Sequence, residues 1–327
     1  MEQIPAKERF NQNVKSVSTP VEILHEALQQ FGMNPKTCEI FHLSGGFMNA
    51  NFLASSKDKR VVLRVYATDV NTAHREFDLL QFLKASPVTA PEVFANFEIH
   101  QRPVLVMEYL DGITLEDRIL NCGPLNLSIY ESIGKELGEI HKIHFDRAGF
   151  IGPKIAIGSE FDNFSIFIGQ FIERTLKNLE ERPDKLDLET NLRFRRLVEE
   201  KWDMVVRTEF FPQLVHCDFN PKNIMVSRDE NPKVLGIIDW EFTVSGNGLI
   251  DIGNFFRFFY DYPAEAKARF INGYNAANSS LHPDWESVSR LIDLGNMCGF
   301  LERTEDYQKS FRTARAVVKS TLEHFGY

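Results

Sequence analysis

The first hundred residues alternate short apolar runs with polar turns, a pattern typical of a small mixed domain of strands and helices. A Ser-Gly-Gly turn at 44–46 separates two apolar runs and predicts a β-hairpin. The β-branched run over 60–66 predicts another strand, and the apolar run over 103–109 predicts a strand that ends before Asp111. The predicted strands are 39–43, 51–55, 60–66 and 103–109, and the predicted helices are 21–31 and 71–84.

Helical spacing of apolar residues dominates after Asp111. Thr114 begins one predicted helix, with Asp117 three residues later as its capping partner. One apolar stripe along a second helix consists of Ile129, Ile133, Leu137 and Ile140. Further helices are predicted over 164–179 and 191–208, two short strands around the turn at 229–232, and almost only helix from Ile250 onward. The patterns predict an α+β fold with a small β-rich lobe, residues 1–110, and a larger, mostly helical lobe, residues 111–327, which carries one inserted hairpin.

The composition narrows the class of protein and its partners. The 327 residues carry a formal net charge of −9, which argues against a nucleic-acid partner because phosphate neutralisation needs clustered Lys and Arg. An acidic surface would attract a cationic substrate, but it also serves solubility, and both interpretations stay open. The polar start of the sequence and the lack of a long apolar run predict a cytoplasmic protein without a membrane partner. The cysteines are too far apart to indicate a zinc site or a disulfide framework; they are Cys38, Cys122, Cys217 and Cys298.

A constellation of polar residues lies where two apolar runs end. LVHCDFNPKN at 214–223 holds Asp218 and Asn223 in one short loop, and VLGIID at 234–239 ends in Asp239. Phosphoryl transfer to a hydroxyl needs a carboxylate that accepts the hydroxyl proton and oxygen ligands for magnesium on the nucleotide phosphates. Asp218 suits the first task, and Asn223 and Asp239 suit the second. A single Asp in a loop is usually a turn former or a helix cap, but the ordered set is far more specific.

HCDFNPKN followed by IIDWE resembles the catalytic core of the aminoglycoside phosphotransferase and choline kinase family, a branch of the protein-kinase-like fold. The resemblance implies a two-lobed kinase fold that uses ATP and Mg²⁺, with Asp218 as the catalytic base and Asn223 and Asp239 as the magnesium ligands. We expect His216 to orient the loop rather than to titrate in the reaction. Cys217 occupies a position where many members of the family have Gly, and no nucleophilic role is expected for it.

The motifs of the small lobe fit the same resemblance. LSGGFMNAN resembles the family's phosphate-covering hairpin, in which Gly45 and Gly46 let backbone amides approach phosphate oxygens. Arg64 lies in the strand where a kinase fold carries a Lys that grips the nucleotide phosphates, and Arg can bind two phosphate oxygens at once. The resemblance implies that Glu76 pairs with this basic residue. From the residues alone, a solvent-facing helix charge is the alternative interpretation of Glu76.

The segment between the predicted lobes, VLVMEYLDG, resembles the family's hinge. This resemblance implies that backbone groups of Glu108, Tyr109 and Leu110 meet the adenine edge of ATP.

Three further features have a structural and a functional interpretation. Asp251, in GNGLIDIGNFF, is expected to hydrogen-bond the catalytic loop, although a helix-capping role would also explain it. His141 and His144 are predicted three residues apart on one helix, where packing is the favoured role and metal binding the alternative. The run FFRFFY at 255–260 is expected to be core.

The spacing between the motifs bears on the phosphate acceptor. Residues 240–250, the eleven between Asp239 and Asp251, are too few for the peptide-docking segment of protein kinases. No A-P-E follows them, and the phosphate loop does not read G-x-G-x-x-G. We therefore expect a small-molecule kinase whose acceptor carries a hydroxyl, with aminoglycosides, other amines, sugars and macrolides all open. The alternatives are a nucleotide-binding pseudokinase and a plain structural domain. Five acidic residues are candidates for binding a cationic acceptor, and a solvated charge on a helix surface is the alternative interpretation of each. They are Asp162, Glu173, Asp293, Glu302 and Asp306.

Overall fold

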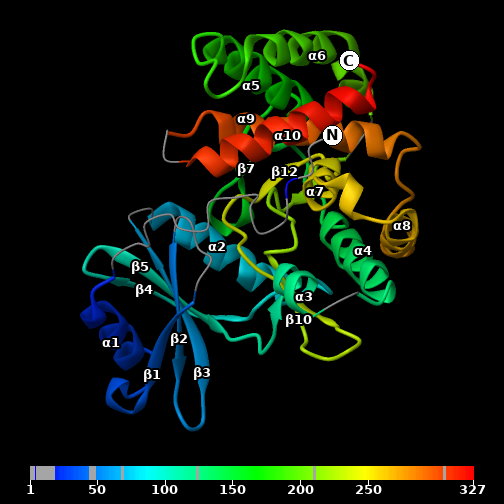
Figure 1. Ribbon diagram of the computed structural model, residues 1–327. Coiled ribbons are helices and arrows are strands. Elements are labelled where there is room, and N and C mark those ends of the chain that lie inside the picture. The colour runs from blue at the N-terminus through cyan, green and yellow to red at the C-terminus, as the bar shows by residue number, and fades with distance from the viewer. Residues whose placement is uncertain are drawn as a thin grey trace.

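The computed structural model describes residues 4, 19–43, 49–67, 70–122, 125–208, 211–304 and 307–327. Its N-terminal part is built on a sheet and its C-terminal part is mostly helical (Figure 1). The predicted α+β class with a β-rich N-terminal lobe and a helical C-terminal lobe is therefore observed, while the boundary after residue 110 stays a prediction. Among the helices so described, none is both long and apolar enough to cross a membrane.

An antiparallel sheet forms the N-terminal lobe, with its strands in the order β1-β2-β3-β5-β4. The strands are β1 (Glu39–Leu43), β2 (Asn49–Ser55), β3 (Arg60–Tyr66), β4 (Val93–Ile99) and β5 (Arg102–Glu108). The predicted pairing of the first two strands is confirmed, with Leu43 opposite Asn51. Strand β4 was not predicted, because Phe94 on its exposed face obscures the alternation of VFANFEI.

Helices α1 (Val21–Gln30) and α2 (Val70–Leu83) pack against opposite faces of this sheet. The alternation of side chains along β3 is the reason. Leu63 belongs to the core cluster that contains α1, whereas Tyr66 belongs to the cluster that contains α2. Arg64 lies on the same face of β3 as Tyr66, so the strand directs its side chain toward α2.

The helical lobe follows the sequence pattern closely at its long helices. The predicted helix over 164–179 is α5, and the side chain of Thr114 caps α3 by accepting the N–H of Asp117 at 3.0 Å. The α-helices are α3 (Leu115–Asn121), α4 (Ser128–His141), α5 (Phe164–Leu179), α6 (Leu188–Arg207), α7 (Leu249–Phe255), α8 (Ala264–Ala277), α9 (Trp285–Leu301) and α10 (Gln308–His324), and the short 3₁₀-helices are η2 (Pro35–Thr37), η3 (Pro153–Ile155) and η4 (Phe259–Asp261).

The helical lobe also contains two small sheets, where the sequence predicted one hairpin. The predicted hairpin is β10 paired with β11, and β6 joins it; the other sheet has the order β8-β7-β12-β9. The prediction was incomplete because strands this short contain no complete period of alternation. Their bounds are β6 (Ile113–Thr114), β7 (Gly149–Ile151), β8 (Ile157–Glu160), β9 (Gln213–Val215), β10 (Ile224–Val226), β11 (Val234–Ile237) and β12 (Val244–Gly246).

The prediction that His141 and His144 share one helix is wrong. Helix α4 ends at His141, and the chain beyond it pairs with β9, so that His144 forms a β-bridge with Gln213. The N–H of Leu214 donates to the carbonyl of Ile143 at 2.7 Å. His141 itself is fully buried, which fits the packing role that the sequence favoured.

Helices α4 and α8 approach each other so closely that each has a glycine at the crossing. A Cβ added at Gly134 would lie 1.9 Å from the carbonyl oxygen of Phe270, and one added at Gly273 would lie 1.9 Å from that of Glu131. Real Cβ atoms do not approach backbone oxygens this closely, so the two glycines set the distance between the helices.

We predict that Gly134→Ala lowers the free energy of unfolding by about 3 kcal/mol, because the helices must separate to admit the methyl group. The measurement is urea unfolding followed by circular dichroism. The matched control is Gly299→Ala in α9, where an added Cβ meets no atom within 4 Å, and a gain of up to about 1 kcal/mol is expected from better helix propensity. Equal stability of Gly134→Ala and the wild type would contradict the close crossing.

Candidate active site

The loop between β9 and β10 is held by one buried carboxylate. Asp251, in the first turn of α7, accepts the backbone N–H groups of His216 and Cys217, each at 2.8 Å. The predicted hydrogen bond from Asp251 to this loop is therefore confirmed. His141 lies 3.2 Å from the same carboxylate through Nε2, and its Nδ1 is 3.0 Å from the hydroxyl of Tyr274. The loop is thus tied to both α7 and α4.

His216 is neutral and structural in this arrangement. Its Nδ1 accepts the N–H of Asp218 at 3.2 Å, and its Nε2 lies 3.1 Å from the carbonyl oxygen of Ile238. These two contacts fit an imidazole that carries its proton on Nε2. Burial lowers the pKa of His216. The contacts fit the prediction that His216 orients the loop.

The backbone at Cys217 has a conformation that suits glycine, the residue that the resemblance leads one to expect at this position. Its φ angle is +63°, in the left-handed region that glycine adopts without steric cost. Burial raises the pKa of its thiol well above the usual range, so the thiolate form that a nucleophile needs is disfavoured.

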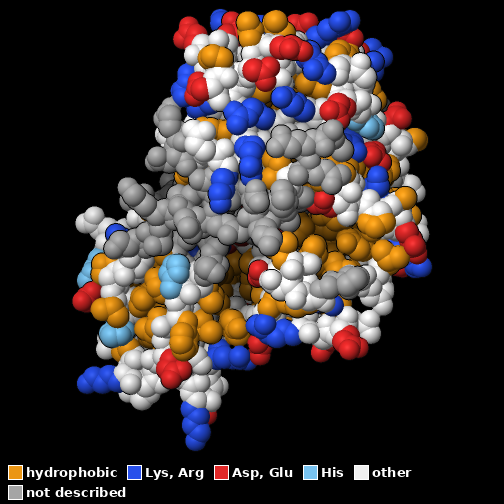
Figure 2. All heavy atoms as spheres, in the orientation of Figure 1, with side chains coloured by type: hydrophobic (Ala, Val, Ile, Leu, Met, Phe, Trp, Pro, Cys, Tyr) orange, Lys and Arg blue, Asp and Glu red, His pale blue; other side chains and the backbone are white. Residues whose placement is uncertain are grey.

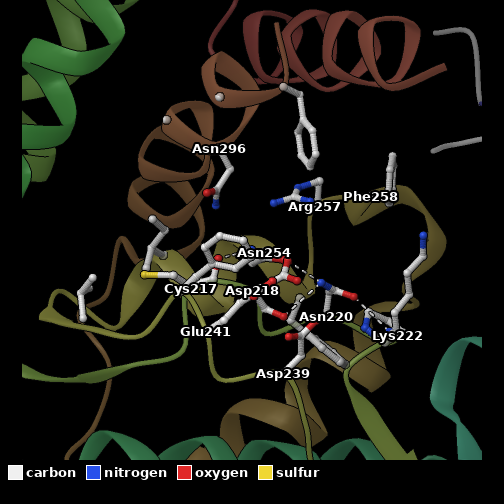
Figure 3. A pocket seen from close by; sticks show the side chains of 18 of the residues that line it. Cys217, Asp218, Asn220, Lys222, Asp239, Glu241, Asn254, Arg257, Phe258 and Asn296 are labelled. Carbon is white, nitrogen blue, oxygen red and sulfur yellow. Dashed lines mark hydrogen bonds between the residues drawn. The ribbon is translucent and has the colours of Figure 1, made fainter. Parts of the chain in front are cut away.

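Two amide side chains hold Asp218. Asn220 donates to one carboxylate oxygen at 2.8 Å (Figure 3). Asn223 donates to the other at 2.7 Å. Burial raises the pKa of Asp218 to about 7, and the nearby Asp239 carboxylate adds to the rise, while Arg257 opposes it. A carboxyl with this pKa exchanges a proton near neutral pH, as a general base requires.

Asp239 follows β11 and faces Arg64 from the other lobe. The guanidinium of Arg64 lies 2.5 Å from Asp239, 3.3 Å from Glu76 and 3.4 Å from Glu241. The predicted pairing of Arg64 with Glu76 is present, and Glu76 is buried rather than solvent-facing. Burial alone would lower the pKa of Arg64, but Asp239 and Glu76 raise it well above its usual value, so Arg64 remains charged.

Glu241 is a part of the site that the sequence interpretation missed. Asn49 in β2 donates to its carboxylate at 2.7 Å. Burial raises the pKa of Glu241 to about 7, with a further contribution from Asp239. The available signal was its position in IIDWE, two residues after Asp239. Its contact with Asn49 joins the N-terminal sheet to the segment after β11, beside Arg64 and Asp239.

Of the two segments predicted to contact the nucleotide, the structure describes the hinge but not the glycine turn. Glu108 ends β5, where its N–H donates to the carbonyl of Glu92 at 2.8 Å. Tyr109 lies under the guanidinium of Arg60, 4.9 Å from its ring centre, and the carbonyl of Leu110 accepts from Gly112. Contact of these residues with adenine stays a prediction. Gly45 and Gly46 lie outside the described residues.

A cavity of about 600 Å³ opens beside the loop that carries Asp218. Asp218, Asp239 and Glu241 lie in its wall, and aromatic rings make up a large share of the other lining residues. Arg257, within the run predicted as core, also lines it and makes a bidentate pair with Asp293 at 2.8 and 2.9 Å. The aromatic lining residues are Tyr130, Phe150, Phe161, Phe164, Phe167, Phe171, Phe242, Phe255, Phe258, Tyr262 and Phe300.

Of the acidic groups suggested for the acceptor, those that the structure describes do not line this cavity. Asp162 and Glu173 are exposed, as expected for solvated charges. Asp293 is buried in its pair with Arg257, and Glu302 accepts the hydroxyl of Thr175 at 2.8 Å. The last candidate, Asp306, lies outside the described residues.

Comparison with known proteins identifies the family. The sequence profile of the phosphotransferase enzyme family matches residues 40–291, well over half of the chain. The chain therefore belongs to this family, as the resemblance predicted, and the interpretation of its motifs as coincidental is not supported.

Solved structures confirm the two-lobed, protein-kinase-like fold. The chain superimposes on the aminoglycoside phosphotransferase APH(4)-Ia in complex with ADP and hygromycin B with a TM-score of 0.69, at 15% identity over 92% of this chain and 98% of that one. For the gentamicin complex of APH(2")-IIa the TM-score is 0.61, at 20% identity over 94% and 97% of the two chains.

A curated relative from Arabidopsis thaliana, named "Probable acyl-CoA dehydrogenase IBR3", is 28% identical over 240 residues. The match covers 68% of this chain and 28% of that protein. The similarity therefore involves only about a quarter of the relative's length.

We predict that Asp251→Asn lowers the free energy of unfolding by about 3 kcal/mol, because an amide can accept only one of the two loop N–H groups and turns its own NH₂ toward the other. Chemical denaturation measures the change. The control is Asp284→Asn, whose carboxylate is largely exposed and should matter by less than about 0.5 kcal/mol. Indistinguishable losses in the two variants would show that the loop does not depend on the Asp251 charge.

Proposed function

We propose that the chain is an ATP- and Mg²⁺-dependent small-molecule kinase that transfers the γ-phosphoryl group to a hydroxyl of its acceptor. One observation carries the proposal: Asp218, held by Asn220 and Asn223, lies in the wall of a cavity large enough for a small molecule. Membership of the phosphotransferase enzyme family supports it.

Asp218 would orient the acceptor hydroxyl and take its proton as the oxygen attacks the γ-phosphorus. Fixing the attacking oxygen beside the nucleotide removes much of the entropic barrier to a bimolecular reaction. The hydrogen bonds from Asn220 and Asn223 fix the plane of the carboxylate, so its free lone pairs have a defined direction into the cavity.

The residues proposed as magnesium ligands fit the ion chemically. Asn223 gives its amide N–H to Asp218, which leaves its amide oxygen as the atom suited to a metal, and Asp239 offers a carboxylate. Oxygen ligands of this kind suit Mg²⁺, which usually retains water and takes its remaining ligands from phosphates. The bound ion would neutralise charge on the β- and γ-phosphates.

Arg64 would offset phosphate charge from the small lobe, held in place by Glu76. Gly45 and Gly46 would cover the phosphates, and the backbone of residues 108–110 would meet adenine, with the lobes dividing after residue 110. The dehydrogenase activity in the relative's name is not proposed for this chain, because the match involves only about a quarter of that protein.

A nucleotide-binding pseudokinase is the second candidate. It is favoured by one contact, the pair between Arg64 and Asp239, since a guanidinium on a metal-binding carboxylate would compete with the metal. The simultaneous presence of Asp218, Asn223 and Asp239 favours the kinase, because a protein that only binds nucleotide does not need a catalytic base.

We predict that Asp218→Asn lowers acceptor-dependent ADP release from Mg-ATP about a hundredfold or more, because the variant keeps the shape of the side chain and removes the base. The assay uses a panel of hydroxyl compounds that includes aminoglycosides, amino alcohols, sugars and macrolides. Nucleotide binding, followed by thermal shift, should persist in the variant. Undiminished ADP release would rule out Asp218 as the base.

We predict that Arg64→Lys raises the KM for Mg-ATP about tenfold while folding is retained, because Lys keeps the charge but loses the planar fork that meets several carboxylates. Arg64→Ala should instead lower the free energy of unfolding by about 3–5 kcal/mol, since it leaves Glu76, Asp239 and Glu241 together without their cation. Steady-state kinetics and denaturation measure the two effects. Faster turnover by Arg64→Lys would favour the pseudokinase, in which Arg64 suppresses catalysis.

A further inference from the structure

The cavity beside Asp218 has an apolar interior that the motifs do not explain. Two groups of rings line it, one from β7, α5 and the residues between β8 and α5, and one from the end of α7 and the segment that follows it. In the first group, Phe161 stacks on Phe167 with ring centres 4.2 Å apart, and Phe150 meets Phe161 edge-on at 4.9 Å. In the second group, Phe255 lies 5.5 Å from Tyr262. Side chains so placed present carbon surface to whatever occupies the space.

Several of the apolar side chains that line the cavity are exposed. Phe150 is 43% exposed, Phe167 is 37% exposed and Phe242, next to Glu241, is 49% exposed. Ile119 and Leu120 in α3 also line the cavity with comparable exposure. Large apolar side chains gathered in one hollow are unusual on a protein surface unless a partner covers them. Figure 2 shows hydrophobic side chains gathered in the hollow between the sheet and the helical lobe.

The charges in the lining do not suit a polycation. Away from Asp218, Asp239 and Glu241, the described lining residues that carry a negative charge are Glu116 and Asp261, against Lys222, Arg303 and Arg257, the last of which is already paired with Asp293. A sugar with several ammonium groups needs several carboxylates within contact distance, because desolvating an unpaired charge is costly. Figure 3 shows Arg257 on the side of the cavity that faces Asp218.

We propose that the acceptor is an alcohol with a largely apolar, aromatic or alkyl body, rather than a polycationic sugar. The inference rests on the proposed kinase activity. The acceptor's body would lie between the Phe150–Phe167 rings and the Phe255–Tyr262 rings, with its hydroxyl at Asp218. The oxygen would form the new bond to the γ-phosphorus as the bond to the β–γ bridging oxygen breaks, its proton passing to Asp218 and ADP leaving.

The first test measures ADP release and phosphorylated product for a series of phenylalkyl and alkyl alcohols of increasing length, against hygromycin B and gentamicin. For the apolar series, kcat/KM should rise about threefold per added methylene until the cavity is filled, because each buried methylene contributes a constant increment. Preferential phosphorylation of the two aminoglycosides would overturn the inference and leave the kinase proposal intact.

The second test locates the binding surface. Phe167→Ala should lower kcat/KM for the best apolar alcohol about tenfold, chiefly through KM, since it removes a ring from the wall without touching the reacting atoms. The matched control is Phe82→Ala in α2, a residue with 44% exposure outside the cavity lining, which should leave kcat/KM unchanged. An equal loss in both variants, or none in Phe167→Ala, would overturn the assignment.

Direct binding of the alcohols to the full chain, measured by calorimetry with a non-hydrolysable ATP analogue and Mg²⁺, separates the two proposals. Saturable binding that weakens in Phe167→Ala, without phosphorylation of any compound, would support the apolar specificity of the cavity and overturn the kinase activity. If the apolar alcohols are neither bound nor phosphorylated, the inference itself is overturned.

Discussion

Asp251 brings a carboxylate into the fully buried interior of the helical lobe, where an uncompensated charge would cost several kcal/mol. The compensation comes from the two backbone N–H groups of His216 and Cys217 and from His141. The two backbone donors are supplied only if the loop takes one particular conformation, including the left-handed backbone at Cys217. The requirement to satisfy one buried charge therefore fixes the path of the loop, and with it the direction of Asp218.

The same reasoning extends to the electrostatics of the site. Glu76, Asp239 and Glu241 all lie within 3.4 Å of the Arg64 guanidinium, and Asp218 is close enough to Asp239 for its pKa to rise. One cation shared by this many acids leaves an excess of negative charge in a partly buried place. A divalent cation would relieve that excess, which is a physical reason to expect the metal at Asp239 and Asn223 in addition to the resemblance of motifs.

The sequence was most informative where several candidate site residues lie close together in one short segment. HCDFNPKN contains the loop with Asp218 and Asn223, and IIDWE contains Asp239. The alternation of side chains along β3 is enough to direct Arg64 toward α2. For Glu76, only the tertiary structure could decide between an ion pair with Arg64 and a solvent-exposed charge. The cavity could not be predicted, because its rings come from several separate elements and none of them stands out from core periodicity by itself. Arg257 was missed for the same reason, since it lies inside the aromatic run at 255–260.

A cationic acceptor, which the net charge left open, shows how a global property differs from a local one. A net charge of −9 over the whole chain acts through solvent, where salt screens it within about 8–10 Å, so it influences encounter more than recognition. Within the cavity, water is displaced, and the groups that touch the acceptor determine the free energy of binding. Those groups include many aromatic and aliphatic side chains, with Arg257 already paired to Asp293. The chemistry of the lining is therefore a better guide to the acceptor than the charge of the chain.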